Sequence, residues 1–294
     1  LEAGGMRRDQ MPDLVEGSQA SGQLRAELAK EWGITGTVIV AGGGGDNAVA
    51  ACGVGAMREG DGFVSLGTSG VLLATRDSYA PLPASAVHTF CHAIPDTWYQ
   101  MGVMLSATDS LNWLAQITGA SPAELAGALG DSIAGPSPVR FLPYLSGERT
   151  PHNDAAIRGS FTGLSIGTDR AEMTQAVMEG VAYGLRDHLE ALKQTGASLD
   201  RLLAIGGGAR SAYWVELLAT VLDLPIDLPE AGDFGAALGA ARLGMAAVTG
   251  ASPAEIMTAP AIARSVAPRK DLTEAYGDGY AAFRATYPAV KAIQ

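Results

Sequence analysis

The stretch that decides the fold reads Thr37-Val38-Ile39-Val40-Ala41-Gly42-Gly43-Gly44-Gly45-Asp46-Asn47. The apolar run 38–40 suits a strand that is buried on both faces. Four glycines follow, and they let the backbone take positive φ angles and approach a ligand closely. Asp46 and Asn47 then stand at the carboxyl end of the predicted strand, just before a small-residue segment that can form a helix. Ligands bind at this edge in open α/β sheets.

Two interpretations of Asp46 remain open at this point. In the first, its carboxylate is a catalytic base, and the rest of the chain builds an ATP site that faces it. In the second, the glycines form a flexible turn and Asp46 is the N-cap of the helix. Glycine runs are common in turns, so this stretch alone does not separate the two.

Composition bounds the classes of function. The chain has 294 residues, of which 47% are hydrophobic, so it can form one large domain or two of ordinary size. The net charge of −11 disfavours nucleic acid or an anionic membrane as partner. No apolar segment approaches the ~20 residues needed to span a bilayer. The chain does not begin with Met, which suggests a processed product or a piece of a longer protein.

Cysteine usage favours a reducing compartment, so we expect a cytoplasmic protein. Cys52 and Cys91 lie outside any CxxC motif or metal-type cluster. His88 and His92 flank Cys91, but on a strand they share one face while Cys91 points the other way. These side chains do not converge, and the sequence therefore predicts no metal site.

Two further glycine corners follow predicted strands. Residues 62–74 are predicted to be a hairpin whose turn, Gly67-Thr68-Ser69-Gly70, offers backbone N–H groups and two hydroxyls to phosphate oxygens. Alone, such a motif is most simply a turn. Residues 202–211 repeat the opening pattern, with an apolar strand, three glycines and a helix over 212–222. The repetition suggests two nucleotide-facing edges of one α/β layer, although neither edge carries a Rossmann or P-loop motif.

Other segments carry expectations about helices and loops. Residues 21–32 are predicted to form a helix capped by Ser21, and residues 169–195 form a long amphipathic one. The small-residue run 232–241 indicates close packing, either as a hinge or as a tight core contact. Glu148 and Arg149 follow an apolar run in a Gly/Pro loop, where they are either functional or an exposed ion pair of little energetic consequence.

The segments 159–164 and 172–179, Gly-Ser-Phe-Thr-Gly-Leu and then Glu-Met…Ala-Val-Met-Glu, resemble the C-terminal signature of the FGGY family of carbohydrate kinases. The likeness covers nearly the whole chain, and the run 144–152 resembles xylulokinases in particular. This family lies within the actin, hexokinase and heat-shock ATPase superfamily. The resemblance implies an α/β, actin-like ATPase (ribonuclease H-like) domain with a mixed sheet flanked by helices.

The resemblance also implies roles for individual residues. Asp46 would be the base that takes the proton from the sugar hydroxyl, and Asn47 would be a second substrate contact. Gly67, Thr68 and Ser69 would hold the ATP phosphates. The residues that would line the adenosine pocket or lie near the nucleotide are Gly206, Gly207, Gly208, Ser211 and Asn112.

The resemblance implies further limits on the chain. Residues 1–36 would be a lead-in from an interdomain region, and residues 37–294 the C-terminal ATP-binding domain, with the N-terminal sugar-binding domain absent. The family has a Gln or Asn contact to the nucleotide shortly after the adenosine glycines, and Glu216 stands nearest to that position here.

The implied reaction is ATP-dependent phosphorylation of a ketopentose, D-xylulose to D-xylulose 5-phosphate, with Mg²⁺ and with Asp46 as base. The alternatives are another polyol, such as glycerol, ribulose or gluconate, and a non-catalytic nucleotide-binding fragment. The expected partners are a sugar and ATP, and the resemblance leaves room for a homodimer.

Overall fold

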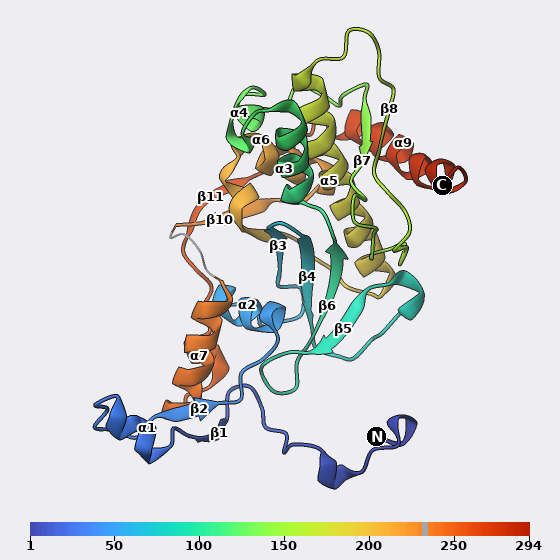
Figure 1. Ribbon diagram of the computed structural model, residues 1–294. Coiled ribbons are helices and arrows are strands. Elements are labelled where there is room, and N and C mark those ends of the chain that lie inside the picture. The colour runs from blue at the N-terminus through green and yellow to red at the C-terminus, as the bar shows by residue number, and fades with distance from the viewer. Residues whose placement is uncertain (231–234) are drawn as a thin grey trace.

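The computed structural model describes residues 1–230 and 235–294, and in this part of the chain seven strands form one mixed sheet (Figure 1). The strand order is β11-β10-β9-β3-β4-β6-β5. β3 pairs antiparallel with β4 and parallel with β9, so the sheet changes direction at its centre. The prediction of a mixed sheet flanked by helices is confirmed. The strands are β3 (Gly62–Leu66), β4 (Gly70–Arg76), β5 (His88–Cys91), β6 (Trp98–Met104), β9 (Leu202–Ile205), β10 (Ile226–Pro229) and β11 (Ile262–Val266).

The larger helical layer covers one face of this sheet. Val64 of β3 points into it and is fully buried. The long helix predicted over residues 169–195 is confirmed as α5 (Arg170–Gln194). The side chain of its N-cap, Asp169, accepts the backbone N–H of Glu172 at 2.9 Å. A small sheet of β7 (Arg140–Leu142) and β8 (Ser160–Thr162) lies beside this layer. The helices are α3 (Thr108–Thr118), α4 (Pro122–Gly127), α5 (Arg170–Gln194), α6 (Ala212–Leu222) and α9 (Thr273–Lys291).

The smaller layer packs α2 (Asp46–Val54) and α7 (Ala236–Thr249) on the other face, and α8 (Pro253–Ile256) contacts α7. Phe63 of β3 points into this layer. A Cβ added at Gly239 of α7 would lie 1.7 Å from the carbonyl oxygen of Val49 in α2. The small-residue run is thus a tight helix crossing over the part that the structure describes, while its residues 232–234 lie outside the described residues.

The opening strand lies elsewhere than the sequence predicts. β2 (Ile39–Ala41) pairs with β1 (Ala20–Gln23) in a separate antiparallel ribbon beside α7 (Figure 1). Val40 is 47% exposed, so the prediction of a strand buried on both faces is wrong. Because β2 is outside the main sheet, the prediction that two glycine units form two edges of one layer is also wrong.

The helix predicted over residues 21–32 is wrong at its start, because that part of the chain belongs to this ribbon. Ser21 lies in β1, and its hydroxyl donates to the carbonyl of Val40 at 3.0 Å instead of capping a helix. The helix itself, α1 (Ala26–Glu31), is shorter. Over residues 1–230 and 235–294, none of the helices combines the length and apolar character needed to cross a membrane.

Candidate functional site

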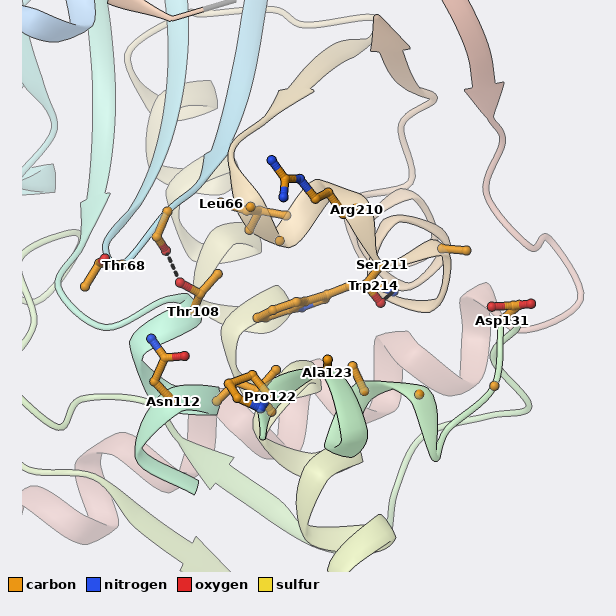
Figure 2. A pocket seen from close by; sticks show the side chains of 18 residues that line it. Leu66, Thr68, Thr108, Asn112, Pro122, Ala123, Asp131, Arg210, Ser211 and Trp214 are labelled. Atoms are coloured by element: carbon orange, nitrogen blue, oxygen red, sulfur yellow. Dashed lines mark hydrogen bonds between the residues drawn. The ribbon is translucent and has the colours of Figure 1, made fainter. Parts of the chain in front are cut away.

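Two of the predicted glycine corners meet at a cavity of about 730 Å³ (Figure 2). The cavity lies where β3 and β9 reach their carboxyl ends, and α3, α4, α6 and the loop after α4 supply the rest of its wall. Because β3 and β9 are parallel neighbours, their terminal loops emerge at one edge of the sheet. The predicted residues that line the cavity are Gly67, Thr68, Asn112, Gly207, Gly208 and Ser211.

The first corner is the turn between β3 and β4, and the predicted hairpin is confirmed. Gly67 and Thr68 line the cavity, whereas the exposed Ser69 stands outside its lining. The hydroxyl of Thr108 donates to the carbonyl of Gly67 at 2.8 Å (Figure 2). The turn is therefore tied to the start of α3.

The second corner packs against the first. Gly206 has a φ of +90°, and a Cβ there would lie 2.7 Å from the carbonyl oxygen of Leu66 in β3. A Cβ at Gly208 would lie 2.8 Å from the Cβ of Leu66. Gly206 itself is not part of the lining. At Gly207 a Cβ would meet no atom of the described residues within 4 Å, so this backbone faces open space.

The N-terminus of α6 completes this corner. Ser211 is the N-cap, and its hydroxyl accepts the N–H of Trp214 at 3.3 Å. Trp214 is 2% exposed, and its indole N–H donates to the carbonyl of Met178 at 3.2 Å. The ring is thereby fixed in the cavity wall.

Sequence reasoning missed much of the wall. Trp214, Pro122 and Ala123 give one part of the lining an apolar surface, and Thr108 and Asp131 add polar groups (Figure 2). An apolar wall with a few polar groups at its edge is typical of small-molecule sites. In sequence four of these residues read as ordinary helix positions and Asp131 as a loop residue, and the strand-to-glycine pattern that found the corners does not reach them.

Glu216 lies behind the wall and is not part of the cavity lining. Its carboxylate accepts the hydroxyl of Ser132 and the N–H of Ile133, each at 2.7 Å. The guanidinium of Arg269 donates to the same Ser132 hydroxyl at 3.2 Å. These bonds hold the loop that carries Asp131, so Glu216 supports the lining through its neighbours.

Asp46 and Asn47 open α2 in the smaller layer, and neither lines the cavity. Gly45 is the N-cap, so the interpretation of Asp46 as the cap is wrong by one residue. The exposed carboxylate of Asp46 accepts the backbone N–H of Asn47 at 2.8 Å and its amide at 3.1 Å. Burial, with the charge of Asp46 as the next contribution, raises the pKa of Tyr99 to about 12. Asp46 therefore stands near β6, open to solvent.

Two of the four glycines before Asp46 pack closely against other parts of the chain. A Cβ at Gly42 would lie 2.4 Å from the carbonyl oxygen of Glu16, and one at Gly44 would lie 2.9 Å from the Cβ of Ala93. At Gly45 a Cβ would meet no atom of the described residues within 4 Å. Gly42 and Gly44 are thus needed for packing, whereas Gly43, at a φ of +76°, and Gly45 border open space.

Glu148 corrects another expectation. Its side chain is buried, whereas Arg149 is exposed, so the interpretation as an exposed ion pair is wrong. The carboxylate accepts the N–H of Arg149 at 2.6 Å. Burial raises the pKa of Glu148 to about 8.

Comparison with known proteins extends the resemblance. The chain is 48% identical over 246 residues to the xylulose kinase of Escherichia coli (strain K12), a match covering 83% of this chain and 50% of that protein. The crystal structure of a "xyloylose kinase" from Brucella ovis is 56% identical, with a TM-score of 0.96 over 100% of this chain and 61% of that one. The xylulose kinase from Rhodospirillum rubrum is 26% identical, with a TM-score of 0.86 over 98% of this chain and 59% of that one.

These matches confirm the predicted fold class, that of actin-like ATPases. The chain spans about half the length of the curated relatives it matches. Residues 1–53 match the family model described as "FGGY family of carbohydrate kinases, N-terminal domain". Residues 62–248 match the model described as the C-terminal domain of the same family. The chain belongs to the FGGY family of carbohydrate kinases.

Proposed function

We propose that this chain supplies the nucleotide site and the catalytic base of a kinase that phosphorylates a ketopentose, D-xylulose to D-xylulose 5-phosphate. The observation that carries the proposal is the shared cavity, because Gly67 and Gly207 come from distant segments and still line one space of about 730 Å³. That volume is within the usual range of small-molecule and cofactor pockets, about 300–1,000 Å³. The relatives named xylulose kinase support the choice of sugar.

ATP would lie along the cavity from one corner to the other. The backbone N–H groups of Gly67, Thr68 and Ser69 would bind the phosphates, which a turn of this kind can do without a charged side chain. The adenosine would lie against the second corner and the apolar wall. The residues we assign to it are Gly206, Gly207, Gly208, Ser211 and Asn112.

We propose that Mg²⁺ arrives bound to the phosphates of ATP. Mg²⁺ keeps several waters and is held largely by substrate phosphates, with one or two carboxylates. Across residues 1–230 and 235–294, His, Cys, Asp and Glu side chains form no group of three or more suited to a metal ion. We therefore treat MgATP as the substrate and assign no residue of this chain as a metal ligand.

Asp46 would supply the base, and Asn47 would contact the sugar beside it. An alcohol is a poor nucleophile at neutral pH, so a carboxylate that accepts its proton accelerates transfer, typically by about 10²–10⁴-fold. The exposure of Asp46 and the open space at Gly45 support this role, since a sugar needs access to the carboxylate. The remaining acceleration would come from positioning of the two substrates and from charge stabilisation by Mg²⁺ and backbone N–H groups.

The division of the chain and its setting are also proposals. We place the C-terminal domain at residues 37–294 after a lead-in of residues 1–36; the family's N-terminal model reaches residue 53 and its C-terminal model starts at residue 62. The two cysteines outside any cluster support the cytoplasm as the compartment. We propose a homodimer as the assembly to test first.

The test is Asp46→Asn in the full-length protein. Turnover of D-xylulose should fall by about 10²–10⁴-fold, because the amide cannot accept the proton, while the affinity for ATP stays unchanged. A coupled ADP-release assay measures turnover, and calorimetry measures ATP binding. Ribulose, glycerol and gluconate in the same assay test the choice of sugar.

The matched control is Asp169→Asn, which changes an acid at another helix start but keeps a side chain able to cap α5. It should leave turnover unchanged. Full activity of the Asp46→Asn protein would remove Asp46 from the role of base. ATP binding without transfer to any of the four polyols by the unsubstituted protein would favour a nucleotide-binding module instead.

A further inference from the structure

The start of α3 is capped by the first glycine corner. Its leading N–H groups donate to two carbonyls of the turn between β3 and β4. The N–H of Thr108 donates to Gly67 at 3.0 Å, and those of Ala107 and Asp109 donate to Thr68 at 2.9 and 3.3 Å. Helix N-termini carry N–H groups that need such partners, so this arrangement satisfies the helix and fixes the turn together.

The side chain of Thr108 adds a contact that the helix itself does not need. Its hydroxyl donates to the Gly67 carbonyl at 2.8 Å, so that oxygen accepts two hydrogen bonds from one residue (Figure 2). The methyl group of Thr108 would lie 3.2 Å from a Cβ at Gly208. Thr108 therefore borders both glycine corners and lines the cavity between them.

The hydrogen bonds to the Gly67 and Thr68 carbonyls also fix the direction of the N–H groups in the same peptide units. In a trans peptide the carbonyl and the following N–H point in opposite directions. The carbonyls of Gly67 and Thr68 are directed at α3, so the N–H groups of Thr68 and Ser69 are directed away from it. The N–H groups of Thr68 and Ser69 are two of the three that we propose to bind the ATP phosphates.

We infer that Thr108 is a positioning residue that orients the phosphate-binding N–H groups through the Gly67 carbonyl, and this inference rests on the proposed function. Thr108 acts on the nucleotide phosphates and not on the nucleoside. Its removal therefore weakens the binding of ligands that carry phosphates and leaves the binding of the bare nucleoside unchanged. A residue that only stabilised the fold would weaken every ligand alike.

The experiment compares Thr108→Val with the unsubstituted full chain, using calorimetric titration with ATP, ADP and adenosine. Valine keeps the shape of threonine and loses the hydroxyl. We expect the affinities for ATP and ADP to fall about fivefold, the usual scale for one hydrogen bond, and the affinity for adenosine to stay the same. Thr108→Ser keeps the hydroxyl and should restore the affinity for both phosphate-bearing ligands.

The control is Thr118→Val at the other end of α3. Its hydroxyl donates to the carbonyl of Leu114 at 2.7 Å, within the helix, and should not affect any of the three ligands. An equal loss for adenosine and ATP in Thr108→Val, or no loss at all, overturns the inference while the proposed function stands. An unsubstituted chain that binds none of the three ligands overturns both.

Discussion

The three consecutive glycines after β9, residues 206–208, are needed for different reasons. Gly206 and Gly208 lie against Leu66, where a Cβ would be 2.7 and 2.8 Å from its nearest atoms. Gly207 lies between them and lines the cavity. The packing of the corner and the room for a ligand therefore depend on different residues.

We predict opposite consequences for alanine at two of these positions. Gly207→Ala places a methyl group in the cavity, so ADP affinity should fall about tenfold or more, while the free energy of unfolding changes by less than about 0.5 kcal/mol. Gly206→Ala meets a carbonyl at positive φ, so the free energy of unfolding should fall by about 1–3 kcal/mol. Calorimetry and urea titration measure the two quantities. Unchanged ADP affinity in Gly207→Ala would contradict the assignment of the corner.

At this scale the sequence predicted the corners and missed their supports. Gly67 and Gly207 stand out because a glycine after an apolar strand is a local pattern. Thr108 supports Gly67 from 41 positions further along the chain, and such a pairing leaves no local signal. The burial of Glu148 was missed for the same reason, since it depends on what the fold lays over the loop.

Among the elements, the crossing of α2 and α7 is the contact that depends most on small side chains. Gly239 of α7 faces the backbone of Val49, and Gly53 of α2 would place a Cβ 2.7 Å from the carbonyl oxygen of Gly235. The two helices approach closely because glycine stands at both points. This crossing fixes the start of α2 and so the position of Asp46.

Gly239→Ala should lower the free energy of unfolding by about 1–3 kcal/mol or more, because the methyl group overlaps the Val49 carbonyl. Gly244→Ala in the same helix is the matched control. A Cβ there meets no atom of the described residues within 4 Å, and alanine favours helix by about 1 kcal/mol, so this variant should be more stable. Urea titration of both variants checks the signs. Equal effects would show that the crossing does not limit stability.

Elements were predicted well where their own residues decide them. The helix α5 carries its cap and an apolar stripe over 25 residues, and its prediction held at both ends to within a residue. The run 38–40 has the composition of a buried strand but pairs in an outlying ribbon. The residue composition of a segment indicates a preference for extended backbone, but it does not indicate which strand the segment will pair with.

For the whole molecule, buried carboxyl groups set the response to pH. Burial raises the pKa of Glu148 to about 8, that of Glu179 to about 7 and that of Asp187 to about 6. In the unfolded chain such groups lose their protons near pH 4. Between pH 4 and 8 these three groups therefore hold more protons in the folded state, and their contribution to the free energy of unfolding falls as the pH rises.

Buried histidines affect the stability of the fold at acidic pH. Burial lowers the pKa of His188 to about 3 and that of His92 to about 4. The unfolded chain takes up these protons below pH 6.5, so the contribution of these histidines to stability falls as the pH drops from 6.5 towards 4. Together the two sets place the highest stability at mildly acidic pH.

Glu148→Gln should flatten the alkaline side of this profile. The amide carries no proton to lose, so the variant should lack a slope of up to about 1.4 kcal/mol per pH unit between pH 5 and 8. Urea titrations at several pH values measure it. Parallel profiles for the variant and the unsubstituted protein would show that Glu148 keeps the same protonation on unfolding.

The pairing of β3 with β9 has a consequence for synthesis. The strands β3 to β6 follow one another and can pair as soon as they leave the ribosome, but Phe63 pairs with Leu203, far along the chain. Until α5 and β9 have been translated, the larger-layer face of the nascent sheet, with Val64, stays uncovered. Such late closure makes nascent chains slow to fold and prone to aggregate. This face of the nascent sheet therefore lacks its native cover while residues 105–200 are being translated.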